Sequence, residues 1–137
     1  MNIMLDEGAF APTRAHYTDA GLDLKTPRAA YLFPHSSVTI DTGVHFEIPK
    51  GYWGKIESKS GLNINHSVVS LGGTIDSGYT GSVKVKLYNL SGEPYEFKCG
   101  DKIAQLVITP CVLDDCKEVD AFAETERGDN GFGSTGR

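Results

Sequence analysis

Hydrophobic and polar residues alternate in short runs along the middle of the chain. Between residues 83 and 88, Val83, Val85 and Leu87 alternate with Lys or Tyr, a period of two that buries one face of a β-strand. Similar short runs lie between turn residues at 43–48, 51–57, 95–97 and 103–108. Turn signals recur about every 8–12 residues, which is typical of an all-β sandwich or barrel.

Helices are poorly supported by the sequence, because Gly or Pro interrupts nearly every window. The exception is residues 112–123, where one helical face would carry Val112, Cys116, Val119 and Ala123. An extended arm that links the body to the tail explains this stretch equally well. The pattern leaves both alternatives open.

The chain of 137 residues has room for one domain with one sizeable core. We expect a β domain over residues 1–126 and a flexible glycine-rich lid over residues 127–137. The net charge of −5 repels nucleic-acid polymers and anionic membranes, and no apolar run approaches the roughly 20 residues of a membrane span. We therefore expect neither a nucleic-acid polymer nor a membrane as a partner. An anionic small molecule could still bind where hydrogen-bond donors are concentrated at one place.

The start of the chain and its cysteines indicate a reducing compartment. Residues 1–10 carry Asp6 and Glu7 and lack a cationic region ahead of an apolar one, so we expect no signal peptide. The cysteines are odd in number and lack CxxC spacing: Cys99, Cys111 and Cys116. We expect a cytoplasmic protein with reduced thiols, at least two of them buried or half-buried.

The C-terminal segment 127–137 carries much of the candidate chemistry. It matches G-x-G-x-x-G, but only one residue follows the third glycine, so the helix of a dinucleotide-binding motif has no room. A lid over a nucleotide fits better: Phe132 would cover a base, and the phosphates would be bound by Arg127, Ser134 and Thr135. Glycine and serine alone would also suit a disordered tail, but the Arg and Phe among them favour the lid.

Three further segments offer polar groups in unusual surroundings. In residues 73–81, between two strand-like runs, Asp76 could be a general base and Tyr79 could stack on a sugar. Asp23 stands between apolar residues, and residues 58–62 offer hydroxyls, a cation and a glycine N–H, as a phosphate site would. Taken singly each is weak, and the first alone would be a hairpin with a turn aspartate.

The order of these segments carries more weight than any one of them. The sequence resembles the dUTPase family in five ordered motifs: AGLDL at 20–24, SKSGL at 58–62, GTIDSGYTG at 73–81, GDKIAQLVI at 100–108 and RGDNGFGSTG at 127–136. The resemblance implies a jelly-roll-like β subunit and a homotrimer whose three active sites each use all three chains. It also implies Mg²⁺-dependent hydrolysis of dUTP to dUMP and pyrophosphate, which limits uracil in DNA and supplies dUMP for thymidylate synthesis.

The resemblance also implies a role for each matched residue. Asp76 would activate the attacking water, Tyr79 would lie under the deoxyribose and exclude a 2′-hydroxyl, and Asp23 would hold a magnesium-bound water. Phosphate contacts would come from Lys59, Ser60, Gly61 and Gln105. The tail would grip the γ-phosphate and cover uracil through Arg127, Phe132, Gly133, Ser134 and Thr135. The base would be read largely by backbone around the third motif, near Ser70 and Gly73.

Two positions depart from the family pattern. Lys59 stands where most members have Arg, which keeps the charge but loses the bidentate fork. Ser70 stands where many members have Asn, six residues before the expected catalytic aspartate. We therefore expect base recognition to depend more on backbone or water, with the chemistry retained.

Two other functions share this scaffold. A dCTP deaminase would carry a glutamate in the strand after the third motif, and Lys86 stands at that position here. A non-catalytic nucleotide-binding or regulatory protein would be expected to lose Asp76 or the tail, and both are present. A second, regulatory role beside catalysis stays open.

Overall fold

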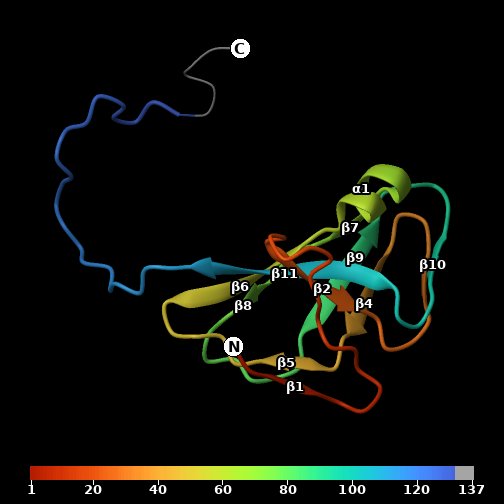
Figure 1. Cartoon of the computed structure of the whole chain (residues 1–137). Helices are drawn as coiled ribbons and strands as arrows, with labels where there is room; N and C mark the ends of the chain where they lie inside the picture. Colours follow the sequence, from red (N-terminus) through yellow and green to blue (C-terminus); the bar gives the residue numbers. More distant parts are fainter. Residues whose placement is uncertain (132–137) are drawn as a thin grey trace.

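The computed structural model describes residues 1–131, whose regular secondary structure is all β-strand apart from one short helix (Figure 1). The strands, in chain order, are β1 (Ile3–Leu5), β2 (Gly21–Lys25), β3 (Ala30–Leu32), β4 (Ser37–Asp41), β5 (Val44–Phe46), β6 (Tyr52–Glu57), β7 (Val68–Ser70), β8 (Thr74–Ile75), β9 (Lys84–Asn89), β10 (Tyr95–Phe97) and β11 (Lys102–Pro110). The fold class is therefore the all-β, jelly-roll-like architecture expected from the sequence.

Two main sheets face each other across the core. One has the strand order β2-β11-β6-β8 and the other β4-β9-β7, and β1-β5 and β10-β3 form two-stranded ribbons beside them. All of these pairings are antiparallel. Neighbours in a sheet are mostly distant in sequence, so each sheet collects residues from several motifs.

The core follows from the alternation seen in the sequence. Val83, Val85 and Leu87 are fully or almost fully buried, while Lys84 and Lys86 point to solvent. Leu106 and Phe97 meet them from the other strands. Because burying one such side chain contributes about 1.5–3 kcal/mol, this shared core is the main stabilising feature of the fold.

The helix α1 (Ser60–His66) was not expected from the sequence. It is only seven residues long, has Gly61 in its first turn and receives no side-chain N-cap hydrogen bond. Such a segment is a weak helix in isolation. Tertiary contacts therefore account for it: Leu62 packs on the core, and Ser67 closes the C-terminus in a left-handed conformation at φ 54°.

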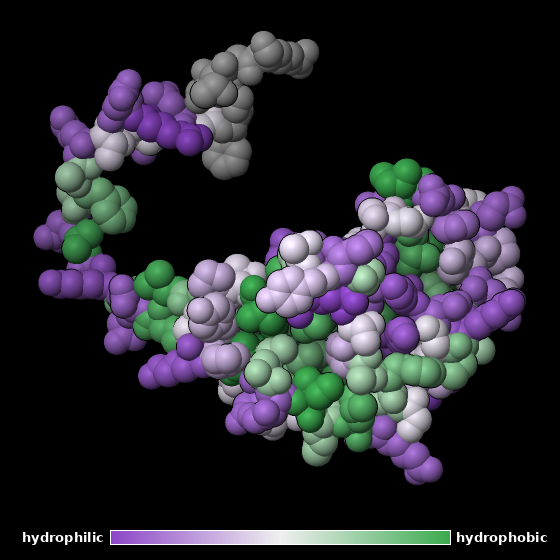
Figure 2. Space-filling model, viewed as in Figure 1, coloured by the Kyte–Doolittle hydropathy of each residue, from purple (hydrophilic) through white to green (hydrophobic). Residues whose placement is uncertain are grey.

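Beyond β11, the described chain continues as an extended arm, residues 111–131, without helix or strand. Its trace leaves the sheets (Figure 1), and apolar side chains lie exposed along it (Figure 2). Val112 is 81% exposed and Phe122 92%, so the two open alternatives for 112–123 resolve as an arm. No helix within residues 1–131 is long and apolar enough to cross a membrane.

The expectation that at least two cysteines are buried or half-buried was wrong for this chain. Cys111, at the end of β11, is half-buried, whereas Cys99 and Cys116 are exposed. Cys99 lies in the turn before β11 and Cys116 in the arm, and neither segment packs into the core. All three thiols are free.

Candidate active site

The third motif forms an open cavity. Asp76 directly follows β8, which pairs with β6 through Gly54 and Lys55. A cavity of about 270 Å³ is lined by Gly73, Thr74, Ile75, Asp76, Tyr79, Ser82 and Lys84. The structure thus brings together the predicted base, the predicted sugar-stacking ring and Gly73.

Asp76 is exposed to solvent, and its side chain makes no hydrogen bond or ion pair with residues 1–131. Its backbone carbonyl accepts a hydrogen bond from the Tyr79 amide at 3.0 Å, which closes a turn over residues 76–79. The turn fixes the direction of the backbone and leaves the carboxylate free to contact a water molecule or a substrate.

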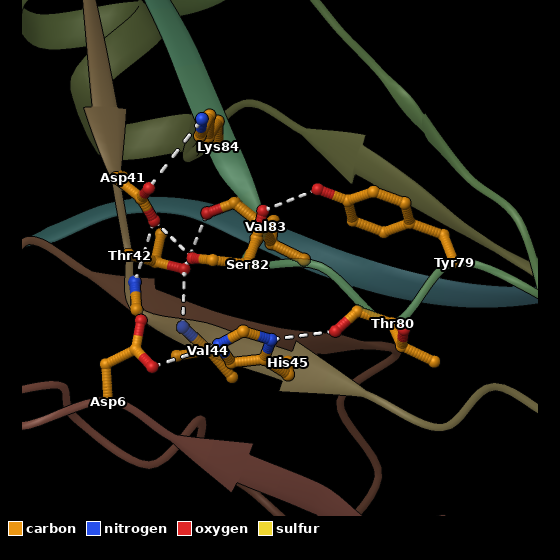
Figure 3. A network of polar contacts seen from close by, with 11 residues as sticks. Asp6, Asp41, Thr42, Val44, His45, Tyr79, Thr80, Ser82, Val83 and Lys84 are labelled. Atoms are coloured by element: carbon orange, nitrogen blue, oxygen red, sulfur yellow. Dashed lines mark hydrogen bonds and ion pairs between the residues drawn. The ribbon is translucent and has the colours of Figure 1, made fainter.

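The ring of Tyr79 is held in place although it is 43% exposed. Its hydroxyl donates to the Ser82 carbonyl at 3.0 Å (Figure 3). A Cβ at Gly81 would overlap the ring, so only glycine leaves room for the ring in this orientation. One face of the tyrosine therefore packs against its own loop, and the side chain lines the cavity beside Asp76.

A second cluster surrounds Asp23 on β2. Asp23 is only 3% exposed, and its carboxylate forms ion pairs with Lys59 and with Lys102, the latter at 2.7 Å. Burial would raise the pKa of Asp23, but the hydrogen bonds from Lys102 and Lys59 outweigh it and hold the pKa below its usual value. Asp23 is therefore held as a buried anion between two cations.

Gln105, Ser58 and Ser70 link the Asp23 cluster to the second motif. Gln105 lies opposite Asp23 in the β2–β11 register and donates to the Ser58 carbonyl at 3.1 Å. The Ser70 amide donates to the Ser58 hydroxyl at 2.8 Å. Gly21 allows the Gln105 carboxamide to lie across β2, since a Cβ at Gly21 would overlap it. Lys59, Ser60 and Gly61 follow Ser58 directly and begin α1.

The sites expected from the sequence thus form two groups within one chain. Asp23, Lys59, Ser70 and Gln105 belong to the buried cluster, and Gly73, Asp76 and Tyr79 line the open cavity. Among residues 1–131, no hydrogen bond or ion pair joins Asp76 to the buried cluster.

The tail residues stand apart from both groups. Arg127 lies on the exposed arm, where its Nε donates to the Asn130 carbonyl at 2.9 Å within a local turn. Phe132, Gly133, Ser134 and Thr135 lie outside the described residues. Arg127 therefore has no contact with Asp76 or Asp23 in the part of the chain that the structure describes.

Sequence reasoning missed several residues that support these two groups. Lys102 lies within the fourth motif, and that membership was the available signal. His45, Asp41 and Ser82 lie in or beside strands outside the family motifs, and only the fold brings them to the Tyr79 loop. Within residues 1–131, no three His, Cys, Asp or Glu side chains gather in a way that could hold a metal ion directly.

Comparison with known proteins bears on this geometry. The family model of dUTPase matches residues 8–136. The deoxyuridine 5′-triphosphate nucleotidohydrolase of Clostridium novyi (strain NT) is 41% identical over 133 residues, which cover 96% of this chain and 94% of that protein. The enzyme of the same name from Mus musculus is 38% identical over 135 residues, covering 98% of this chain and 83% of that protein.

Solved structures agree in fold. The Staphylococcus bacteriophage 80alpha dUTPase with dUPNHPP superposes with a TM-score of 0.93 at 32% identity, over 99% of this chain and 98% of that one. A variant of the phage phi11 dUTPase of S. aureus, described with a coordinated structural Mg(II) ion, has a TM-score of 0.82 at 32% identity, over 88% of this chain and 97% of that one. With the sequence motifs, the fold and these relatives in agreement, the chain belongs to the dUTPase family.

Proposed function

We propose that this enzyme hydrolyses dUTP to dUMP and pyrophosphate, with a water molecule activated by Asp76 attacking the α-phosphorus. The observation that carries the proposal is the open cavity, in which an exposed carboxylate with no partner among residues 1–131 lies beside the ring of Tyr79. A carboxylate without competing donors can accept the proton of a bound water. General-base assistance of this kind contributes about 10²–10⁴ in rate.

Tyr79 would recognise the sugar. Its hydroxyl donates to the Ser82 carbonyl and Gly81 leaves room for the ring in this orientation, so the ring offers a flat surface to the deoxyribose. A ring held in this position would leave no space for the 2′-hydroxyl of a ribonucleotide. Gly73, on the same cavity, would bring backbone groups to the base.

The phosphates of dUTP carry close to four negative charges, and the chain has an excess of acidic residues. Local cations must therefore supply the attraction. Lys59 lies at the start of α1 with Ser60 and Gly61, which are both exposed residues, and Gln105 donates to the carbonyl of the preceding Ser58. Arg127 and the tail residues Phe132, Gly133, Ser134 and Thr135 would close over the nucleotide from the arm.

Magnesium fits this arrangement when it is held through water. Asp23 has acceptor capacity beyond its two lysine contacts, because a carboxylate offers about four lone-pair positions. It would hold a metal-bound water, and most ligands would be phosphate oxygens, as Mg²⁺ commonly prefers. The ion would neutralise phosphate charge. The structural Mg(II) described for the phage phi11 relative supports including Mg²⁺ in the proposal.

A homotrimer with shared sites would complete each active centre. The support is geometric: Arg127, the first residue of the proposed lid, lies on the exposed arm and has no hydrogen bond or ion pair with Asp76 or Tyr79 among residues 1–131. Three free thiols favour a reducing compartment, which supports a cytoplasmic location. The proposed reaction would limit uracil in DNA and supply dUMP for thymidylate synthesis.

Substrate profiling tests the proposed function. The protein is incubated with Mg²⁺ and dUTP, dCTP, dTTP or UTP, and pyrophosphate and the nucleotide product are measured. The proposal requires pyrophosphate and dUMP from dUTP, with much slower release from the other three. Release of ammonia from dCTP would instead identify the deaminase alternative, and no turnover of any nucleotide would favour the non-catalytic one.

A further inference from the structure

His45 makes two hydrogen bonds that the proposed reaction does not account for. It lies in the middle of β5, and its side chain is only 17% exposed. Nδ1 is 2.8 Å from the Thr80 carbonyl oxygen, and Nε2 is 3.1 Å from Oδ1 of Asp6 (Figure 3). His45 therefore bridges the segment after β1 to the loop that carries Tyr79.

Both partners of His45 accept hydrogen bonds. A backbone carbonyl and an ionised carboxylate have no proton to give, and a neutral imidazole has only one N–H. The two contacts can therefore both be hydrogen bonds only when His45 is an imidazolium cation. Hydrogen bonding to the Thr80 carbonyl and then to Asp6 raises the pKa of His45 above its usual 6.5, although partial burial acts in the opposite direction.

The charged groups that face His45 come from two segments. Asp6 follows β1, whose Met4 is the register partner of His45, and Asp41 ends β4 and adds its negative charge from farther away. Asp41 also contacts Lys84 at 3.9 Å. From the loop over residues 76–82, the group that faces His45 is the Thr80 carbonyl.

The contacts of Thr80 and its neighbours bear directly on Tyr79. Thr80 is the next residue in the chain, and Ser82 accepts the Tyr79 hydroxyl. The Ser82 hydroxyl in turn donates to Asp41. The segment from Tyr79 to Ser82 is thus anchored to the sheets at two points, by His45 at Thr80 and by Asp41 at Ser82 (Figure 3).

We propose that the His45–Asp6 pair is a positioning element for Tyr79, and that loss of the His45 proton loosens the ring that faces the deoxyribose. The inference rests on the sugar-binding role proposed for Tyr79. It makes dUTP affinity depend on pH through a histidine that lies outside the five family motifs.

Deprotonation should release Thr80 rather than Asp6. The remaining proton stays where the acceptor is charged, because a hydrogen bond to a carboxylate is stronger than one to a carbonyl. The Nδ1 lone pair would then face the Thr80 oxygen, which repels it. Since the pKa of His45 is raised, the anchor is complete below about pH 6.5 and is lost as pH rises through that higher value.

Two variants, each replacing one ring nitrogen of His45 by an amide nitrogen, separate the two hydrogen bonds. In His45→Asn, the amide nitrogen takes the place of Nδ1 and donates to Thr80 at every pH. In His45→Gln, the amide nitrogen takes the place of Nε2, reaches Asp6 and leaves Thr80 without its donor. Both side chains stay uncharged, and the titration of dUTP itself is the same in the assays of all three proteins.

The test is the pH dependence of KM and kcat for dUTP between about pH 6 and pH 9. We expect KM of the unaltered enzyme to rise about three- to tenfold relative to His45→Asn, the range for loss of one hydrogen bond, with kcat unchanged. His45→Gln should have the higher KM at every pH. A KM that follows the same pH curve in the unaltered enzyme and both variants overturns the inference.

An NMR titration without substrate separates this inference from the proposed function. The Tyr79, Thr80 and Ser82 amide resonances should shift with the same midpoint as the His45 ring in the unaltered protein, and the step should vanish in His45→Asn. That result supports the anchor even if dUTP is not a substrate. If the Tyr79, Thr80 and Ser82 resonances do not shift as His45 titrates, the proposed anchor is contradicted, whichever nucleotide the enzyme hydrolyses. Because the comparison of midpoints needs only the unaltered protein, it stays decisive even if His45→Asn folds poorly.

Discussion

The two carboxylates that the motifs identify lie in opposite environments. Asp23 is buried at 3% exposure between two lysine ammonium groups. Asp76 is exposed beside an open cavity, without a side-chain partner among residues 1–131. The first is charged and fixed before any ligand arrives. The second has its acceptor positions free.

Because their environments differ, the two carboxylates suit different roles. A carboxylate between two cations is a poor base, because each cation stabilises its charged form. Such a group serves better to orient lysines and water. A carboxylate open to solvent can exchange one water for another and accept a proton, provided that other groups hold the substrate in line. We therefore propose that the buried cluster organises charge and that the open cavity carries the chemistry.

The largest expected effect is on the open side. Asp76→Asn retains size and removes the proton acceptor, so we expect kcat for dUTP to fall by at least about 10² with binding largely retained. Because Asp76 is exposed and unpaired within the described chain, the melting temperature should not change. Glu96→Gln, an exposed carboxylate on β10, is the matched control and should leave kcat unaltered. Near-normal turnover in Asp76→Asn would remove Asp76 from its role.

A substitution in the buried cluster should lower the stability of the folded protein. Asp23→Asn leaves Lys59 and Lys102 facing each other without their anion, and we expect a loss of about 2–3 kcal/mol in the free energy of unfolding. This is below the roughly 3–5 kcal/mol of a fully buried pair, because the two lysines are 25% and 45% exposed. Urea denaturation measures it, and an unchanged midpoint would contradict the account of the cluster.

The Asp23 cluster also predicts how the stability of the protein changes with pH. The pKa of Asp23 is lowered in the folded state, so its contribution is present above its ordinary value of 3.8 and is lost as pH falls through the lower value. The stability difference between the unaltered protein and Asp23→Asn should therefore shrink in acid. If the stability difference between the two proteins grows in acid, the pKa of Asp23 is not lowered by folding.

Sugar discrimination should show a smaller effect. Tyr79→Ala should weaken dUTP binding by about 1–2 kcal/mol, within the range for one stacking contact, and reduce the preference for dUTP over UTP. Gly81→Ala should give part of this loss, since the added methyl group would displace the ring. Comparable hydrolysis of UTP and dUTP by the unaltered enzyme would refute the role of Tyr79.

The smallest effect belongs to the departure at Lys59. Lys59→Arg restores the residue that most family members carry and keeps the ion pair with Asp23. We expect KM for dUTP to change by less than about fivefold, because the second cation on Asp23 is supplied by Lys102. A change of 10²-fold would mean that lysine here impairs phosphate binding.

Much of the fold is predictable because side-chain alternation and turn residues are local. Val83, Val85 and Leu87 identify β9 and its buried face without any knowledge of its neighbours. Helix α1 was missed because its stability comes from the packing of Leu62, a contact with residues distant in sequence.

The candidate site also has a part that the sequence predicts and a part that depends on the fold. Asp23 was recognisable as unusual because of its apolar neighbours, but its pairing with Lys102 depends on the β2–β11 register. The contact of His45 with Thr80 likewise joins residues 35 positions apart in the chain. Contacts of this kind follow from topology, which residue patterns alone do not specify.

Subunit mixing tests most directly whether another chain completes the open cavity. Asp76→Asn and a truncation after Glu126 each lack one component of every site. Co-refolded in equal amounts, they should form mixed trimers, confirmed by mass. A working site needs Asp76 from a truncated chain and its tail from an Asp76→Asn chain, so about a quarter of sites should recover activity. Activity that stays at the sum of the two backgrounds in proven mixed trimers would contradict the shared site.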